Sequence, residues 1–221
     1  LYLGVPADTY VYPSLKLKAT KALKMKNKQT EESIALAKDQ FSFSVYRKDS
    51  DGATEPSWND KTFNSGGCTL VGTAKNDADG NITFDLGEQF IDKTVEANKN
   101  NYLVENAGND LDITYDPAVY KIVVTVQDNQ TLLMKVPSRE NPNSDVPLYV
   151  HNYTITSVSP GDSTNSLEKD DQGYYSINGP AEKTFTNKYT PYTSTGTWTP
   201  KVTKVVKGGE MKEFKLEFAD N

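Results

Sequence analysis

The segment LKLKATKAL (residues 15–23) alternates strictly between two kinds of position, which predicts a strand with one buried face. Lysine is almost never fully buried unless it has a partner. The expected buried face nevertheless includes a lysine among apolar side chains: Leu15, Leu17, Ala19, Lys21 and Leu23. Lys21 therefore needs a specific partner inside the fold.

A second strand, KTFTNKYT (residues 183–190), poses the same question with an amide. Its alternation places Phe185, Asn187 and Tyr189 on one face. A buried amide without hydrogen-bond partners costs roughly 1–3 kcal/mol. Asn187 is thus a second polar residue on a face that should be buried.

Between these two segments, short runs of alternating or β-branched residues are separated by turn residues. This arrangement is typical of an all-β sandwich with an Ig-like architecture. The runs predicted as strands are 41–46, 68–74, 81–86, 100–106, 113–116, 119–129, 132–137, 148–158 and 173–178.

Three local predictions refine this pattern. Residues 28–40 (KQTEESIALAKDQ) are the best candidate for a short helix. The turn sequence KNDADG (residues 75–80) predicts a hairpin between the strands on either side of it. Residues 119–129 and 132–137 are also interpreted as the two strands of a hairpin.

Composition narrows the possible partners. The chain has 221 residues, a formal net charge of -6 and 36% hydrophobic residues. The acidic balance argues against nucleic acid or an anionic membrane as the main partner. The single cysteine, Cys68, excludes an intrachain disulfide.

No metal or other cofactor is expected. A single histidine, His151, cannot build a histidine-based metal site alone. The acids of residues 77–88 resemble a calcium loop, but Ile82 stands where such a loop requires glycine. A hairpin is the better interpretation of this stretch.

The last part of the chain partly repeats the first. After a Thr/Pro/Gly-rich linker, VTKVVKGGEMKEFKLEF (residues 202–218) resembles ATKALK and DQFSFSVY, and Lys204 corresponds to Lys21. This repeat predicts tandem domains. The expected organisation is a lead-in (1–14), a complete sandwich (15–190), a linker (191–200) and the first strands of a second, similar domain (201–221).

The two inward polar residues suggest a chemical reaction between them. A neutral lysine amine is a nucleophile, and an asparagine side chain carries a carboxamide carbon that it could attack with release of ammonia. A buried carboxylic acid with a raised pKa could transfer the protons. Glu105, which shares a strand face with Leu103, is the first candidate for this acid, and Glu88, Glu96 and Asp116 are alternatives.

The motifs TKAL, ADGNITF, YLVEN, GNDLDITYD, VYKIVVTV and TFTNKY occur in this order along the chain. In this order they resemble the major shaft pilins of Gram-positive bacteria, of the T-antigen or FctA type. The resemblance covers roughly residues 15–190 and continues in the partial repeat. It implies a Cna B-type Ig-like sandwich with a spontaneous Lys–Asn isopeptide bond.

The resemblance also assigns roles to individual residues. It implies that Lys21 and Asn187 form the cross-link and that Glu105 assists as the proton shuttle. In the reaction that we expect, protonated Glu105 also hydrogen-bonds the Asn187 carbonyl oxygen and stabilises the negative charge that develops there. Lys204 would be the cross-linking lysine of the second domain. The chain would then catalyse one turnover on itself and would not be an enzyme.

The implied setting is an extracellular fibre anchored to the cell wall, whose subunits are joined to one another by sortase. The sequence shows no LPxTG-like sorting signal, and VYPS (11–14) and TPKV (199–202) only partly match the pilin motif that carries the intermolecular lysine.

Two other functions are compatible with the pattern. The chain could be an adhesin that binds a host glycan or matrix protein through long loops at 50–67 and 137–175. It could also be a secreted carbohydrate-active sandwich, although no pair of carboxylates supports this. Trp58 and Trp198 could stack on sugars or could be packing residues.

Overall fold

The structure is a computed structural model of the 221-residue chain. It describes residues 7–26, 30–59, 61–91, 99–141, 143–161, 163–177, 184–191, 201, 203–210 and 213. The chain divides into two units, Leu1–Pro191 and Tyr192–Asn221.

The described part of the first unit consists of strands, turns and loops. Within the described residues there is no helix, and hence none that is long and apolar enough to cross a membrane. The strands are β1 Thr9–Val11, β2 Lys16–Lys26, β3 Glu31–Ile34, β4 Ser42–Lys48, β5 Ser57–Asn59, β6 Thr62–Asn64, β7 Cys68–Lys75, β8 Asn81–Asp85, β9 Lys99–Glu105, β10 Ile113–Thr114, β11 Val119–Pro137, β12 Asp145–Pro160, β13 Tyr175–Ser176 and β14 Thr184–Tyr189.

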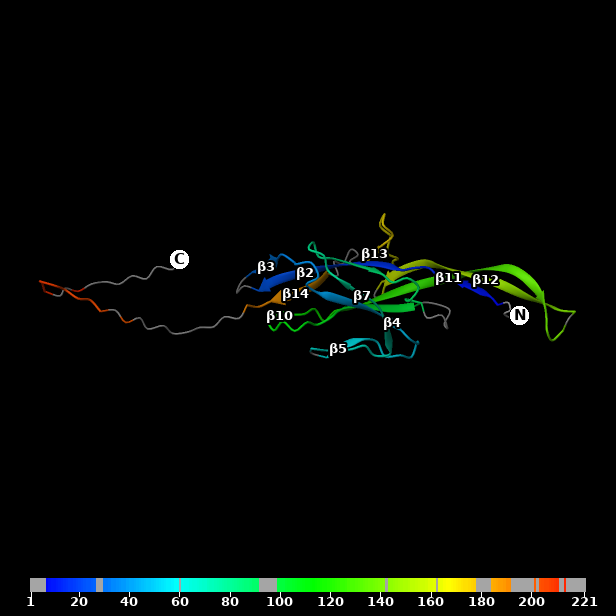
Figure 1. Ribbon diagram of the computed structural model, residues 1–221, viewed down its shortest axis with the longest axis horizontal. Coiled ribbons are helices and arrows are strands. Elements are labelled where there is room, and N and C mark those ends of the chain that lie inside the picture. Colours follow the sequence, from blue (N-terminus) through cyan, green and yellow to red (C-terminus); the bar gives the residue numbers. More distant parts are fainter. Residues whose placement is uncertain are drawn as a thin grey trace, which may run out of the picture. The chain divides into compact units, whose positions relative to one another are not determined.

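Two sheets pack face to face and enclose one apolar core (Figure 1). The first sheet has the strand order β1-β12-β11-β9-β4-β7. The second has the order β10-β14-β2-β13, and β3 and β8 also pair with β2. A separate pair, β5–β6, lies outside these sheets. The predicted all-β, Ig-like sandwich is therefore confirmed.

The central strand of the second sheet is β2, and it follows the predicted alternation. Leu15, Leu17, Ala19, Lys21 and Leu23 are all buried, whereas the residues between them are half-buried. β2 pairs in parallel with β14, so that the first long strand lies beside the last. This pairing places the two inward polar residues of the sequence on neighbouring strands.

The predicted hairpin between residues 119–129 and 132–137 is wrong. These residues form one continuous strand, β11, which pairs along its length with β12. The chain instead reverses beyond the last strand pair, Pro137 with Asp145, in a segment whose sequence is rich in serine and asparagine. The outer parts of β11 and β12 extend beyond the sandwich as a two-stranded arm (Figure 1).

The predicted helix at 28–40 is also wrong where the structure describes it. Residues 31–34 form β3, which pairs antiparallel with the end of β2, and Leu23 lies opposite Ile34. Glu31 lies 3.5 Å from both Lys24 and Lys188. Pairing with a central strand thus overrides the local helix propensity of this segment.

The turn predicted at KNDADG is present, but it does not join two strands of one hairpin. The Asp77 carboxylate accepts hydrogen bonds from the backbone N–H groups of Asp79 and Asn81, and Gly80 has a φ of 84°. The turn connects β7 in the first sheet to β8 in the second. Among the described residues, the two sides of the turn are linked by an isolated β-bridge between Asn76 and Ile82 and by hydrogen bonds between Asp77 and Asn81, and they do not continue as a strand pair.

The second unit is described only in part, at residues 201, 203–210 and 213. Lys204 is half-buried and lies in a described stretch, 203–210, that contains no strand. The remaining residues of the predicted second domain, and the linker residues 192–200, fall outside the described part of the chain.

Candidate functional site

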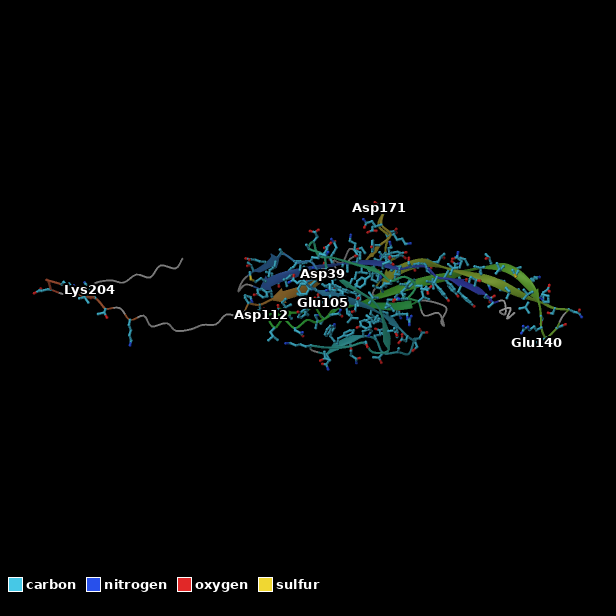
Figure 2. The ribbon with its side chains drawn as sticks, viewed as in Figure 1. Asp39, Glu105, Asp112, Glu140, Asp171 and Lys204 are labelled. Atoms are coloured by element: carbon cyan, nitrogen blue, oxygen red, sulfur yellow. The ribbon has the colours of Figure 1, made fainter. Side chains whose placement is uncertain are left out.

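The structure brings three sequence-predicted residues together inside the sandwich. Lys21 comes from β2, Asn187 from the neighbouring strand β14, and Glu105 from β9 in the opposite sheet. Figure 2 shows Glu105 within the body of the sandwich, while Glu140 lies at the tip of the arm. The site therefore spans both layers of the fold.

Strand register explains why the side chains meet. In the parallel pairing of β2 and β14, Lys21 lies opposite Phe185, and Asn187 lies opposite Leu23. Lys21 and Asn187 are thus diagonal neighbours on the same inward face, within reach of a long side chain. Glu105 is the last residue of β9 and pairs with Phe43 of β4, which aims it across the core.

The Glu105 carboxylate links the other two groups. Lys21 Nζ donates to Glu105 Oε2 at 2.8 Å. Asn187 Nδ2 donates to Glu105 Oε1 at 2.7 Å. One carboxyl group therefore contacts the amine and the amide through different oxygens.

The surroundings of these groups are apolar. Lys21 is 4% exposed, and Glu105 and Asn187 are fully buried. Lys21 Nζ lies 4.7 Å from the centre of the Phe41 ring and 5.9 Å from that of Phe43. The rings of Phe41 and Phe43 therefore take the place of water around the Lys21 amine, which is paired with Glu105.

Burial shifts both ionisable groups toward their neutral forms. It lowers the pKa of Lys21 to about 8, although the nearby Glu105 carboxylate opposes this change. Burial also raises the pKa of Glu105, against the opposing effect of Lys21. Converting the ion pair into a neutral amine and a protonated acid therefore costs less free energy here than it would in water.

The orientation of the Asn187 amide is set by a neighbouring backbone group. The Asp116 N–H lies 2.9 Å from Asn187 Oδ1. Since a backbone N–H can only donate, it requires the amide oxygen on its side and leaves Nδ2 facing Glu105. Glu105 thus contacts the amide nitrogen, and the expectation that it would bind the carbonyl oxygen was wrong.

The alternative acids can now be placed. Glu88 is exposed on the turn that follows β8, and Glu96 lies outside the described residues. Asp116 is next to the site, but its carboxylate contacts backbone N–H groups. Sequence reasoning missed this arrangement, and the only available signal was the Asp-Pro pair after a strand.

A cavity of about 430 Å³ lies beside the site, between the β5–β6 pair and the loop that precedes β11. Its lining includes Trp58, Asp110, Leu111, Ile113, Tyr115 and Pro117. Trp58 also packs on Phe63, with ring centres 5.2 Å apart. Trp198 lies outside the described residues. Among the residues that the structure describes, no cluster of histidine, cysteine, aspartate or glutamate could hold a metal ion.

No protein-family model matches the chain, and no curated protein matches it. The fold and the site nevertheless define a class of molecule: an all-β, Ig-like sandwich with a buried lysine–glutamate–asparagine centre that connects its two sheets.

Proposed function

We propose that the chain is a structural subunit of a bacterial surface pilus or stalk, stabilised by a self-generated isopeptide bond between Lys21 and Asn187. One observation carries this proposal. A lysine and an asparagine on adjacent parallel strands are buried against one shared carboxyl group, that of Glu105. Ordinary core packing gives no reason to bury these three groups together.

The geometry supports a reaction in which atoms and protons balance. Within the ion pair, a proton passes from the Lys21 ammonium to Glu105, which gives a neutral amine and a carboxylic acid. The amine nitrogen attacks Cγ of Asn187 and forms a new C–N bond. Glu105 donates its proton to Nδ2, which leaves as ammonia, and takes up a proton from the attacking nitrogen.

The product suits a structure that carries tension. The bond joins β2 to β14, which are the first and last long strands of the unit. In a linear array, force would enter near one strand, leave near the other, and pass through the covalent link. With a single cysteine in the chain, a disulfide cannot do this.

The wider setting follows from the same proposal and from the resemblance of the sequence motifs. The fibre would be extracellular and anchored to the cell wall, and its subunits would be joined by sortase. Lys204 would serve as the cross-linking lysine of a second domain of the same Cna B type.

Intact mass spectrometry of the purified chain tests the bond. The wild-type chain is expected to be lighter than its sequence mass by one ammonia, and Lys21→Ala should restore the full mass calculated for that variant. Lys24→Ala is the matched control, since Lys24 is partly exposed on the same strand. A folded wild-type chain of full mass would refute the proposal.

A second candidate function, glycan binding by a surface adhesin, is favoured by the cavity beside the site. Trp58 and Tyr115 offer aromatic faces there, and Asp110 offers a hydrogen-bonding group. Binding to a glycan array that is lost in Trp58→Ala, and retained in Tyr10→Ala, would support it. The absence of any wild-type binding would exclude it for the glycans on the array.

A further inference from the structure

The turn formed by Asp116, Pro117 and Ala118 lies directly against the reacting amide. The Asp116 N–H donates to Asn187 Oδ1 at 2.9 Å and lies 3.3 Å from Glu105 Oε2. This backbone group therefore contacts both the amide that would react and the acid that would transfer the protons.

The side chain of the same residue holds that N–H in place. Asp116 Oδ1 accepts a hydrogen bond from the Ala118 N–H at 2.9 Å, which closes the turn. Asp116 Oδ2 accepts one from the Thr186 N–H at 2.7 Å, on the strand that carries Asn187. Pro117 further restricts the backbone of the residue before it to extended conformations.

The pairing of β10 and the carboxylate of Asp116 both hold β14, the strand that carries Asn187. β10 pairs with the far end of β14, where Thr114 lies opposite Lys188. Beyond that pair, the Asp116 carboxylate continues the connection at Thr186, immediately before Asn187. The loop and the strand are thus fixed to one another at the point where the amide projects into the core.

Attack of the Lys21 amine on the Asn187 amide would place negative charge on Oδ1. A hydrogen-bond donor stabilises such charge best at 2.7–3.1 Å from the developing oxyanion in a site that excludes water. The Asp116 N–H already lies 2.9 Å from Oδ1 of the unreacted amide, so the donor is in place before charge develops on that oxygen. Glu105 faces the nitrogen side of the amide, so it is not placed to bind this oxygen.

We propose that Asp116 provides the oxyanion-stabilising group of the centre through its main-chain N–H, and that its carboxylate positions this donor and the strand that carries Asn187. This inference rests on the proposed function, because it concerns the same bond-forming reaction. In this scheme Glu105 transfers the protons, and the Asp116 N–H stabilises the negative charge on Asn187 Oδ1.

The test compares rates of ammonia loss. Unreacted chain, purified under denaturing conditions, is refolded, sampled over time, quenched in acid and examined by intact mass. Asp116→Ala should slow the reaction on the order of tenfold or more, because the donor is loosened but not removed. Asp116→Asn should recover part of the rate, because its amide oxygen can still accept one of the two N–H groups.

Asp112→Ala is the matched control, since it removes the same charge from the residue just before β10, and it should react at the wild-type rate. The melting temperature of each unreacted chain is measured in the Lys21→Ala background. If Asp116 only supports the fold, Asp116→Ala will lower this temperature while the folded chain reacts as fast as wild type, and the inference is overturned. A wild-type chain that never loses ammonia would instead refute the proposed function.

A second measurement applies if Asp116→Ala fails to fold. In the unreactive Lys21→Ala chain, the Asp116 amide proton is followed by NMR with and without the additional change Asn187→Ala. Loss of the acceptor should move this resonance upfield and speed its exchange with solvent. An unchanged resonance would show that the N–H does not bind the Asn187 oxygen, and would overturn the inference.

Discussion

At the scale of single residues, the site depends on a carboxyl group that is buried between an amine and an amide. Glu105 has contacts with both, and its pKa is raised because it is removed from water. A carboxyl group in this state can give and take protons, which an amide of the same shape cannot do.

Glu105→Gln should therefore yield a folded chain of full calculated mass. The glutamine keeps the size of the side chain and can still accept hydrogen bonds, but it cannot shuttle a proton. Glu88→Gln is the control, and it should lose ammonia as the wild type does. Intact mass together with circular dichroism measures both. Ammonia loss at the wild-type rate in Glu105→Gln would remove Glu105 from the mechanism.

The pH dependence of the reaction follows from the shared proton of Lys21 and Glu105. The Lys21 amine and the Glu105 carboxylate share one proton, which lies on Lys21 in the ion pair and on Glu105 in the neutral pair. The reactive neutral pair is therefore populated at every pH at which the two groups together carry this one proton. The rate should stay level below the Lys21 pKa of about 8 and fall as pH rises through it, because the pair then loses this proton.

At low pH the rate should also fall, because the Lys21–Glu105 pair then takes up a second proton and Lys21 stays charged while Glu105 is protonated. This should begin at a higher pH than for an ordinary glutamate, because burial raises the pKa of Glu105. Rates of ammonia loss on refolding into buffers of graded pH measure both limbs. A rate that rises steadily above pH 8 would contradict this scheme and would indicate direct attack without a proton held on Glu105.

At the scale of elements, strand alternation was informative and local propensity was not. The inward face of β2 could be predicted in full, because every second residue is apolar except Lys21. The strand at residues 31–34 could not be predicted from the sequence, since it forms through pairing with β2 and not through local propensity. The partners of Asp116 could not be predicted either, because the Asp-Pro pair marks a turn but does not show which main-chain groups across the fold the carboxylate will contact.

The N-terminal strand β1 offers a separate element-scale prediction. It pairs in parallel with β12, where Tyr10 stacks on His151 with ring centres 4.7 Å apart. His151 Nδ1 lies 2.5 Å from Asp128, and Nε2 lies 3.6 Å from Asp8, which precedes β1. The hydrogen bond to Asp128 is the main cause of a raised His151 pKa, and Asp8 adds to it.

The part of this shift that comes from Asp8 means that the charged histidine stabilises the docked strand β1, whereas the part from Asp128 acts between β11 and β12. This contribution is fully present below the ordinary histidine pKa and is lost as pH rises through the raised value. Hydrogen exchange of the Thr9–Val11 amides should thus quicken, relative to its intrinsic rate, as His151 loses its proton. His151→Gln should abolish this pH dependence, and its persistence in that variant would assign it to another group.

At the scale of the whole molecule, the bond would close a loop containing most of the first unit. By analogy with a disulfide, loss of chain entropy in the unfolded state gives about 5 kcal/mol for a loop of this size. Lys21→Met, which cannot form the bond, should lower the free energy of unfolding in urea by an amount of this order. Lys24→Met should leave it nearly unchanged, and equal stability of the two variants would contradict a role for the bond in stability.

The most direct measurement is peptide mapping of the folded wild-type chain by tandem mass spectrometry. The account predicts a branched peptide in which the Lys21 side chain is joined to Asn187, with no cleavage by trypsin after Lys21. Recovery of two linear peptides, one ending at a free Lys21 and one carrying an intact Asn187 amide, would contradict it.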